Sequence, residues 1–172
     1  MGSTDWIKKE IEFELLDAFA ESSALITGRV SSEFKPGESP DFTAVLEGRS
    51  VGLEVSELRL SDETSGWHYV NEAWRISKKK DASCRRHGRF AVPIILIMFA
   101  ERPPLHDLQH DIAENALEEF DGLGFAEVWF ADLSDKYYGV RDPRRPADLF
   151  GVSPSGIRGF HRYGDWDRKP YG

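Results

Sequence analysis

The alternation of apolar and polar residues is clearest in the segment from 40 to 58. Val51, Leu53 and Val55 alternate with small or polar residues, and a period of two is typical of a strand with one buried face. A shorter apolar run precedes the Glu-Gly pair at 47–48, which predicts a two-residue turn. We therefore expect a β-hairpin over this segment.

The predicted turn sets the register of the hairpin. With it, Leu46 pairs with Arg49, and the same register places Asp41 opposite Glu54. Directly opposed residues have Cβ atoms about 5 Å apart, a separation at which two carboxylates can share a metal ion. A second interpretation needs no metal: Asp41 caps a turn, and Glu54 pairs with an arginine or lysine on the surface.

Periodicity and turn signals divide the rest of the chain into alternating elements. Residues 90–100 predict a strand at the centre of a sheet, because the run is apolar throughout. Helices are expected over about 4–22, 67–86 and 105–120, and further strands over 24–30 and 125–133. The predicted fold class is α/β: an α-β-β-β-α-β core with a central mixed sheet flanked by helices, plus an extra C-terminal helix and strand. We expect one domain over 1–172, with 1–4 outside the fold and 135–172 as an irregular C-terminal extension.

Composition and charge restrict the partners and the cellular compartment that are expected for this domain. The net charge of −8 argues against a general nucleic-acid binder, but residues 61–89 carry seven bases against four acids, which permits a local basic surface. The single cysteine, Cys84, allows no internal disulfide and favours a reducing cytoplasm. No run reaches the length of a membrane span, and the amphipathic start at Trp6–Glu10 argues against a signal peptide. No membrane partner is expected.

The pair Pro40-Asp41, followed by Glu54-Val55-Ser56, resembles the signature of the PD-(D/E)xK, or restriction-endonuclease-like, nuclease superfamily. The predicted order of elements is similar to the core of that superfamily. The resemblance implies that Asp41 and Glu54 hold Mg²⁺ or Mn²⁺, with Glu14 of the first helix as a third ligand. It also implies phosphodiester hydrolysis of nucleic acid by a metal-activated water.

Ser56 departs from that signature, because the superfamily usually has lysine there and a serine hydroxyl can position a water but brings no charge. Two explanations compete. In one, the cation comes from the following helix, where Lys78 and Lys80 flank the expected core face, and Lys78 is taken as the catalytic lysine. In the other, catalysis is lost, and a domain of the same fold binds nucleic acid or a protein partner. A weaker third alternative is a metal-dependent hydrolase of another phosphoester.

Basic residues outside the motif are the candidates for contacting nucleic-acid phosphates. They are Lys80, Arg85 and Arg86 on the second helix, and Arg144 and Arg145 in a loop near the C-terminus. The pattern favours neither DNA nor RNA, and it is compatible with a homodimer.

Overall fold

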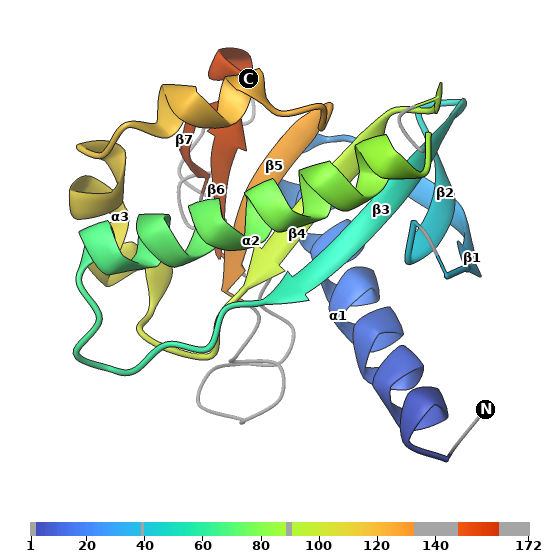
Figure 1. Ribbon diagram of the computed structural model, residues 1–172, viewed down its shortest axis with the longest axis horizontal. Coiled ribbons are helices and arrows are strands. Elements are labelled where there is room, and N and C mark those ends of the chain that lie inside the picture. The colour runs from blue at the N-terminus through green and yellow to red at the C-terminus, as the bar shows by residue number, and fades with distance from the viewer. Residues whose placement is uncertain (1–2, 39, 89–90, 133–147, 162–172) are drawn as a thin grey trace, which may run out of the picture.

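The computed structural model describes residues 3–38, 40–88, 91–132 and 148–161, with side chains from residue 6 onward. The described strands form one sheet in the order β1-β2-β3-β4-β5-β6-β7 (Figure 1). The pairs β3–β4 and β4–β5 are parallel and the other neighbours are antiparallel, so the sheet is mixed. The elements are α1 (Ser3–Thr27), β1 (Ser31–Pro36), β2 (Phe42–Leu46), β3 (Arg49–Glu57), α2 (Gly66–Arg86), β4 (Ile94–Phe99), α3 (Leu105–Ala113), η2 (Leu117–Gly122), β5 (Glu127–Asp132), β6 (Asp148–Ser153), η3 (Ser155–Ile157) and β7 (Gly159–His161).

Helices cover both faces of the sheet and bury two separate cores. On one face α1 contributes Phe19, whose ring lies 6.1 Å from that of Trp129 in β5. On the other face α2 contributes Tyr69, whose ring lies 5.0 Å from that of Phe130. Figure 1 shows α2 lying across the near face of the sheet and α1 on the far side. Among the described helices, none is long and apolar enough to cross a membrane.

The β2–β3 hairpin has the predicted turn. Glu47 and Gly48 both have positive φ angles, 50° and 80°, as the central residues of a type I′ turn require. Leu46 pairs with Arg49 across it. The two-residue turn expected from the sequence is therefore confirmed.

The ladder that follows this turn also has the predicted register. Its last pair is Phe42 with Leu53, and one step further the same register sets Asp41 opposite Glu54. Because β2 begins only at Phe42, residues 54–57 of β3 pair with β4 and not with β2. This leaves a stretch of β3 that β2 does not cover, with α1 on one side and α2 on the other.

The α/β fold class is confirmed, and so is the order of elements through β5, but two boundaries near the start are wrong. The strand expected over 24–30 does not form: α1 continues to Thr27, and Gly28, with φ of 77°, follows it. Glycine in this left-handed conformation is a common helix end. Because α1 begins at Ser3, residues 3 and 4 belong to the fold, contrary to expectation.

The C-terminal part contains more regular structure than expected. The helix predicted over 105–120 divides into α3 and the 3₁₀ helix η2, and the extension predicted to be irregular contains β6 and β7. In β6, Leu149 packs in the α1-side core and Phe150 in the α2-side core. A strand buried on both faces lacks the polar alternation that identifies strands in a sequence. The rest of the predicted extension, 135–147 and 162–172, lies outside the described residues.

Candidate active site

Two carboxylates meet beyond the end of the β2–β3 ladder. Leu53 and Val55 fill the α1-side core, so Glu54 between them projects toward α2, where its side chain is only 5% exposed. Asp41 Oδ2 accepts a hydrogen bond from the Val55 backbone N–H at 3.0 Å. The charge of Asp41 also acts on the Glu54 carboxyl and raises its pKa. The structure thus brings together the two acids that the sequence predicted as metal ligands.

Gly52 allows the chain before β2 to lie directly against β3. A Cβ atom at this position would stand 2.7 Å from Pro40 Cγ, well inside van der Waals contact. Pro40 therefore packs on a residue without a side chain, and Asp41 follows it at the uncovered part of β3. Close approach of backbone is a recurrent reason for glycine within a strand.

A lysine from α2 joins the two acids. Lys80 Nζ lies 2.9 Å from Glu54 Oε2 and 3.6 Å from Asp41 Oδ2. The helix places it there because Ser77 and Cys84 are fully buried against the sheet, and Lys80 lies three residues after the first and four before the second. Residues at these spacings share one side of a helix, so Lys80 continues the buried stripe where α2 passes over Glu54.

Anchors on both sides of Lys80 fix the rotation of α2 about its axis. At the N-terminus, the Gly66 N–H donates to Asp111 Oδ2 of α3 at 2.6 Å, next to the Ser65 cap, whose Oγ accepts from the His68 N–H at 3.2 Å within the first turn. Just after Lys80, Asp81 Oδ1 accepts from the Gly124 N–H at 2.7 Å. The orientation of the lysine is therefore tied to contacts outside the strand acids.

The structure does not bring Lys78, the lysine chosen from the sequence, to the acids. Lys78 is exposed, and its ammonium lies 5.5 Å from the centre of the Trp74 ring. Apolar periodicity includes Trp67 in the core face of α2, but Trp67 is 56% exposed. Including it shifts the inferred face toward Lys78. The buried small residues, Ser77 among them, identify Lys80 instead.

The acid that α1 brings to this region is Glu12 rather than Glu14. Glu14 is exposed. Glu12 lies three and seven residues before Leu15 and Phe19, both buried, and these spacings put it on the buried stripe of α1. Its side chain is 13% exposed. The spacing to Leu15 and Phe19 was the signal in the sequence that could have found it.

Exposed apolar residues at the start of α1 concealed that signal. Ile7 and Ile11 are 51% and 48% exposed, although periodicity places them in the helix core face. The buried residues of α1 begin at Leu15, and in Figure 1 the N-terminal half of the helix extends beyond the sheet. The apolar periodicity of this half therefore does not indicate which side of the helix packs against the sheet.

A second cation, not foreseen from the sequence, comes from the same end of α1. Lys9 Nζ lies 3.7 Å from Asp41 Oδ1 and 3.3 Å from Glu12 Oε2. It also stands 5.1 Å from the centre of the Phe42 ring. Lys9 thus links the first-helix acid to one of the strand acids.

Glu12, Asp41 and Lys80 border an open pocket of about 390 Å³ at the uncovered part of β3, whereas Glu54 and Lys9 are not part of its lining. This volume falls within the range of about 300–1,000 Å³ typical of ligand sites. The half-buried Ser56, the residue that departs from the signature, is part of its wall. The full lining is Lys8, Ile11, Glu12, Leu15, Asp41, Val55, Ser56, Glu57, Arg59, Lys80 and Phe99.

Burial and charge shift the pKa values of the central pair. Burial raises the pKa of Glu54 above the ordinary 4.5, and the neighbouring Asp41 raises it further, while the Lys80 charge opposes both. Burial lowers the pKa of Lys80, but the charges of Asp41 and Glu54 more than offset it, so the pKa is raised above 10.5. Lys80 therefore remains a cation through the neutral range.

The basic residues predicted to contact nucleic-acid phosphates lie in different places relative to the pocket. Arg85 is exposed and pairs with Asp81 at 2.8 Å, and Arg86 is exposed in the last turn of α2. Neither lines the pocket. Arg144 and Arg145 lie outside the described residues. Among the predicted contacts that the structure describes, Lys80 alone borders the pocket, and it does so beside the acids.

The donor set suits a hard divalent cation. Mg²⁺ and Mn²⁺ prefer carboxylate oxygens, and Mg²⁺ commonly uses one or two carboxylates together with water and substrate phosphate. Asp41 and Glu54 provide two carboxylates, and the carboxylate of Glu12, paired with Lys9, lines the pocket with Asp41. Within the described part of the chain, no group of three or more His, Cys, Asp and Glu side chains could hold a metal ion by itself. The residues therefore fit an ion completed by water and substrate.

Comparisons of the chain with protein-family models, with curated proteins and with solved structures find no match.

Proposed function

We propose that this protein is a divalent-metal-dependent nuclease that hydrolyses phosphodiester bonds in nucleic acid. The observation that supports it best is the contact of Lys80 Nζ with Glu54 Oε2, 2.9 Å long. Ser56 leaves the motif without its usual cation, and Lys80 supplies one beside the same two acids. Nuclease chemistry of this kind needs carboxylates for the ion and a cation for the phosphate. Asp41 and Lys80 line one pocket, and Glu54 is in direct contact with Lys80.

Each residue has a distinct role in this proposal. Asp41 and Glu54 hold the metal ion, which when bound would supply a Lewis acid that polarises the phosphate and acidifies a water. Lys80 donates hydrogen bonds to a non-bridging phosphate oxygen, where negative charge grows in the transition state. The Ser56 hydroxyl orients the attacking water. Lys9 holds the Asp41 carboxylate in place through the 3.7 Å ion pair.

One observation favours the alternative, a non-catalytic domain that binds nucleic acid or a protein partner. Lys80 already neutralises Glu54 by direct contact, as the cation of a structural ion pair would. Removing one partner of a buried pair is strongly destabilising, so such a pair can be kept for the fold alone. Only an activity measurement separates these two functions.

The test is cleavage of single- and double-stranded DNA and RNA oligonucleotides, with MgCl₂, with MnCl₂ and with EDTA. We expect metal-dependent cleavage that Asp41→Asn and Glu54→Gln each abolish and that Lys80→Ala reduces about 100-fold. Asparagine at 41 retains an oxygen that can accept from the Val55 N–H, so the fold is preserved. Lys78→Ala is the matched control and keeps full activity.

Two results would contradict the proposal. Cleavage that persists in both Asp41→Asn and Glu54→Gln would come from another site or a contaminant. Binding of nucleic acid without any cleavage, unaffected by these substitutions, would establish the non-catalytic domain instead.

A further inference from the structure

A second pocket adjoins the first on the α2 side of β3. It has a volume of about 360 Å³ and is lined by Ser56, Arg75, Ile76, Lys79, Lys80 and Ser83. Ser56 and Lys80 also line the first pocket, so the two pockets meet at these residues. The first pocket contains α1 residues, whereas the second is formed by α2 and Ser56. They lie on the two sides of the part of β3 that β2 does not cover.

The two pockets differ in charge character. The first contains three carboxylates, from Glu12, Asp41 and Glu57, together with three bases, Lys8, Arg59 and Lys80. The lining of the second includes no acid at all: three of its residues are bases, two carry hydroxyls and one is isoleucine. A pocket lined by cations and hydroxyls is unexpected on a chain with a net charge of −8, and it suits an anion.

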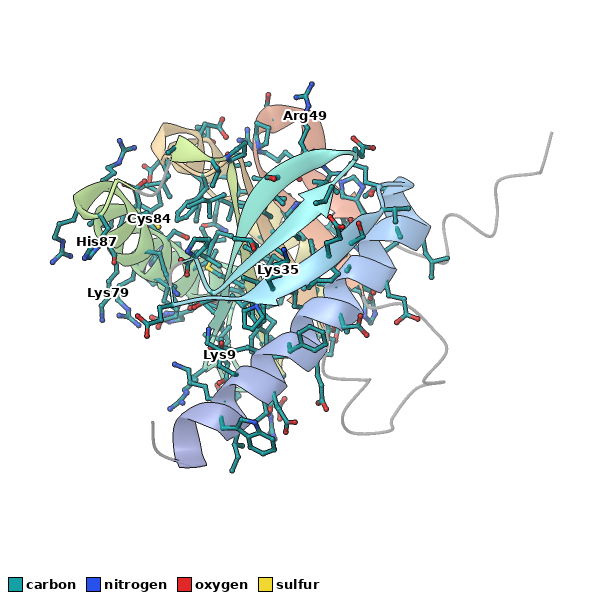
Figure 2. The ribbon with its side chains drawn as sticks, turned by 90° about the vertical axis from the view of Figure 1, so that its right-hand side faces the viewer. Lys9, Lys35, Arg49, Lys79, Cys84 and His87 are labelled. Atoms are coloured by element: carbon teal, nitrogen blue, oxygen red, sulfur yellow. The ribbon has the colours of Figure 1, made fainter. Side chains whose placement is uncertain are left out.

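Of the three cations that line this pocket, Lys79 is the one that forms no ion pair with the described residues. Arg75 pairs with Glu72, and Lys80 is committed to Glu54 and Asp41. Lys79 makes no ion pair with the part of the chain that the structure describes, and Figure 2 shows its side chain reaching outward from α2, on the same side of the view as Lys9 of α1. An ammonium group is a compact point charge that binds phosphate without demanding one geometry.

We propose that the α2-side pocket is a phosphate subsite, in which Lys79 binds the phosphate next to the scissile one along a nucleic-acid strand; this assignment rests on the proposed function. The strand crosses the uncovered part of β3 with its scissile phosphate at Asp41, Glu54 and Lys80. Arg75, Lys79 and Ser83 are spaced by four residues on one flank of α2, over about 12 Å of helix. This flank passes beside Lys80, which contacts the acids.

The lining also indicates the kind of recognition. Bases are read by hydrogen bonds to their edges or by aromatic stacking, whereas phosphate contacts fix position without reading sequence. Within this pocket there is no aromatic ring, carboxylate or side-chain amide. The subsite therefore selects a polyanionic strand and contributes no base specificity.

Lys79→Ala tests this subsite, and its neighbour Lys78→Ala is the matched control. The first probe is binding of fluorescein-labelled DNA and RNA oligonucleotides of mixed sequence in EDTA, measured by anisotropy. One lost charged hydrogen bond corresponds to an affinity decrease of about tenfold. Lys79→Ala should show this decrease for every sequence, with the slope of log K against log salt reduced by about one. Lys78→Ala should match the wild type.

The second probe is bis(p-nitrophenyl) phosphate, which has a single phosphate and cannot reach the subsite. With metal present, Lys79→Ala should lower kcat/KM about tenfold for an oligonucleotide and leave it unchanged for this small diester. Equal binding by the Lys79 and Lys78 variants would overturn the subsite, as would an equal loss on both substrates. If no substrate is cleaved, the nuclease function fails, and the binding experiment still decides the subsite by the same criteria.

Discussion

Lys80 and Glu54 are 26 residues apart in the chain, yet Lys80 Nζ lies 2.9 Å from Glu54 Oε2. The glutamate is carried by β3 and the lysine by α2, which packs on the face of the sheet toward which Glu54 projects. Under the proposed function, the cation that the PD-(D/E)xK signature takes from the same strand comes from a different element. This separation allows the contribution of the lysine to be tested independently of the strand.

Moving the lysine back to the strand should restore activity. Lys80→Ala should reduce kcat by about 100-fold, the usual cost of losing one group that stabilises transition-state charge. Adding Ser56→Lys to that variant places an ammonium on the same face of β3 as Glu54, two residues away. We expect the double variant to recover a substantial part of the lost kcat. Recovery by Lys78→Arg in place of Ser56→Lys would contradict this assignment.

The roles of Glu12 and Glu14, both on α1, can be separated by conservative substitution. Glu12→Gln should weaken Mn²⁺ affinity by about tenfold, as loss of an outer-shell carboxylate commonly does, because Glu12 borders the pocket beside Asp41. Glu14→Gln is the control and should leave affinity unchanged, since Glu14 is exposed. Titration calorimetry with MnCl₂ measures both. Equal affinities in the two variants would remove Glu12 from the site.

The raised pKa of Glu54 predicts the acidic limb of the pH–activity profile. Because burial and Asp41 favour the protonated carboxyl, Glu54 loses its charge on acidification at a higher pH than an ordinary glutamate. Activity should therefore fall through an apparent pKa above 4.5. Protons and metal compete for the carboxylate, so higher MgCl₂ should move this limb to lower pH. A limb that does not respond to MgCl₂ would argue against Glu54 as a ligand.

Removing the Lys80 charge should make stability depend more strongly on pH. Lys80→Met leaves two buried carboxylates side by side, and we expect a loss of about 3 kcal/mol in unfolding free energy at neutral pH. Without the cation, the pKa of Glu54 rises further above its unfolded value. A group with a raised folded pKa favours the fold at low pH and loses that contribution as pH increases. Urea unfolding should therefore show the deficit shrinking on acidification, with Lys78→Met unaffected at every pH.

The two strand acids were predictable because their relation is local. A two-residue turn at Glu47 and Gly48 fixes the pairing of the flanking strands, so the register of Asp41 and Glu54 follows from about a dozen consecutive residues. Alternation then shows which face each side chain occupies. Nothing distant in the chain has to be known.

The helix-borne residues were harder to predict because helix phase depends on tertiary packing. Glu12 and Lys80 lie on the buried sides of their helices, but exposed Ile7, Ile11 and Trp67 displaced the core faces inferred from apolar periodicity. The small or polar residues that mark the real contact, such as Ser77, have no hydrophobic signal. The position at which each helix crosses the sheet decides which of its apolar side chains remain exposed. That position depends on tertiary packing and cannot be inferred from the periodicity of the helix.

The anchors of α2 have a consequence for how this chain tolerates changes in length. The segment between β3 and the Ser65 cap can gain or lose residues while both ends of the helix remain docked. One residue inserted between Gly66 and Lys80 would instead turn the ammonium by about 100° around the axis, with the strand acids left where they were. Insertions before Ser65 should therefore have no effect, whereas insertions a few positions later, within α2, should give a folded protein that lacks the proposed activity.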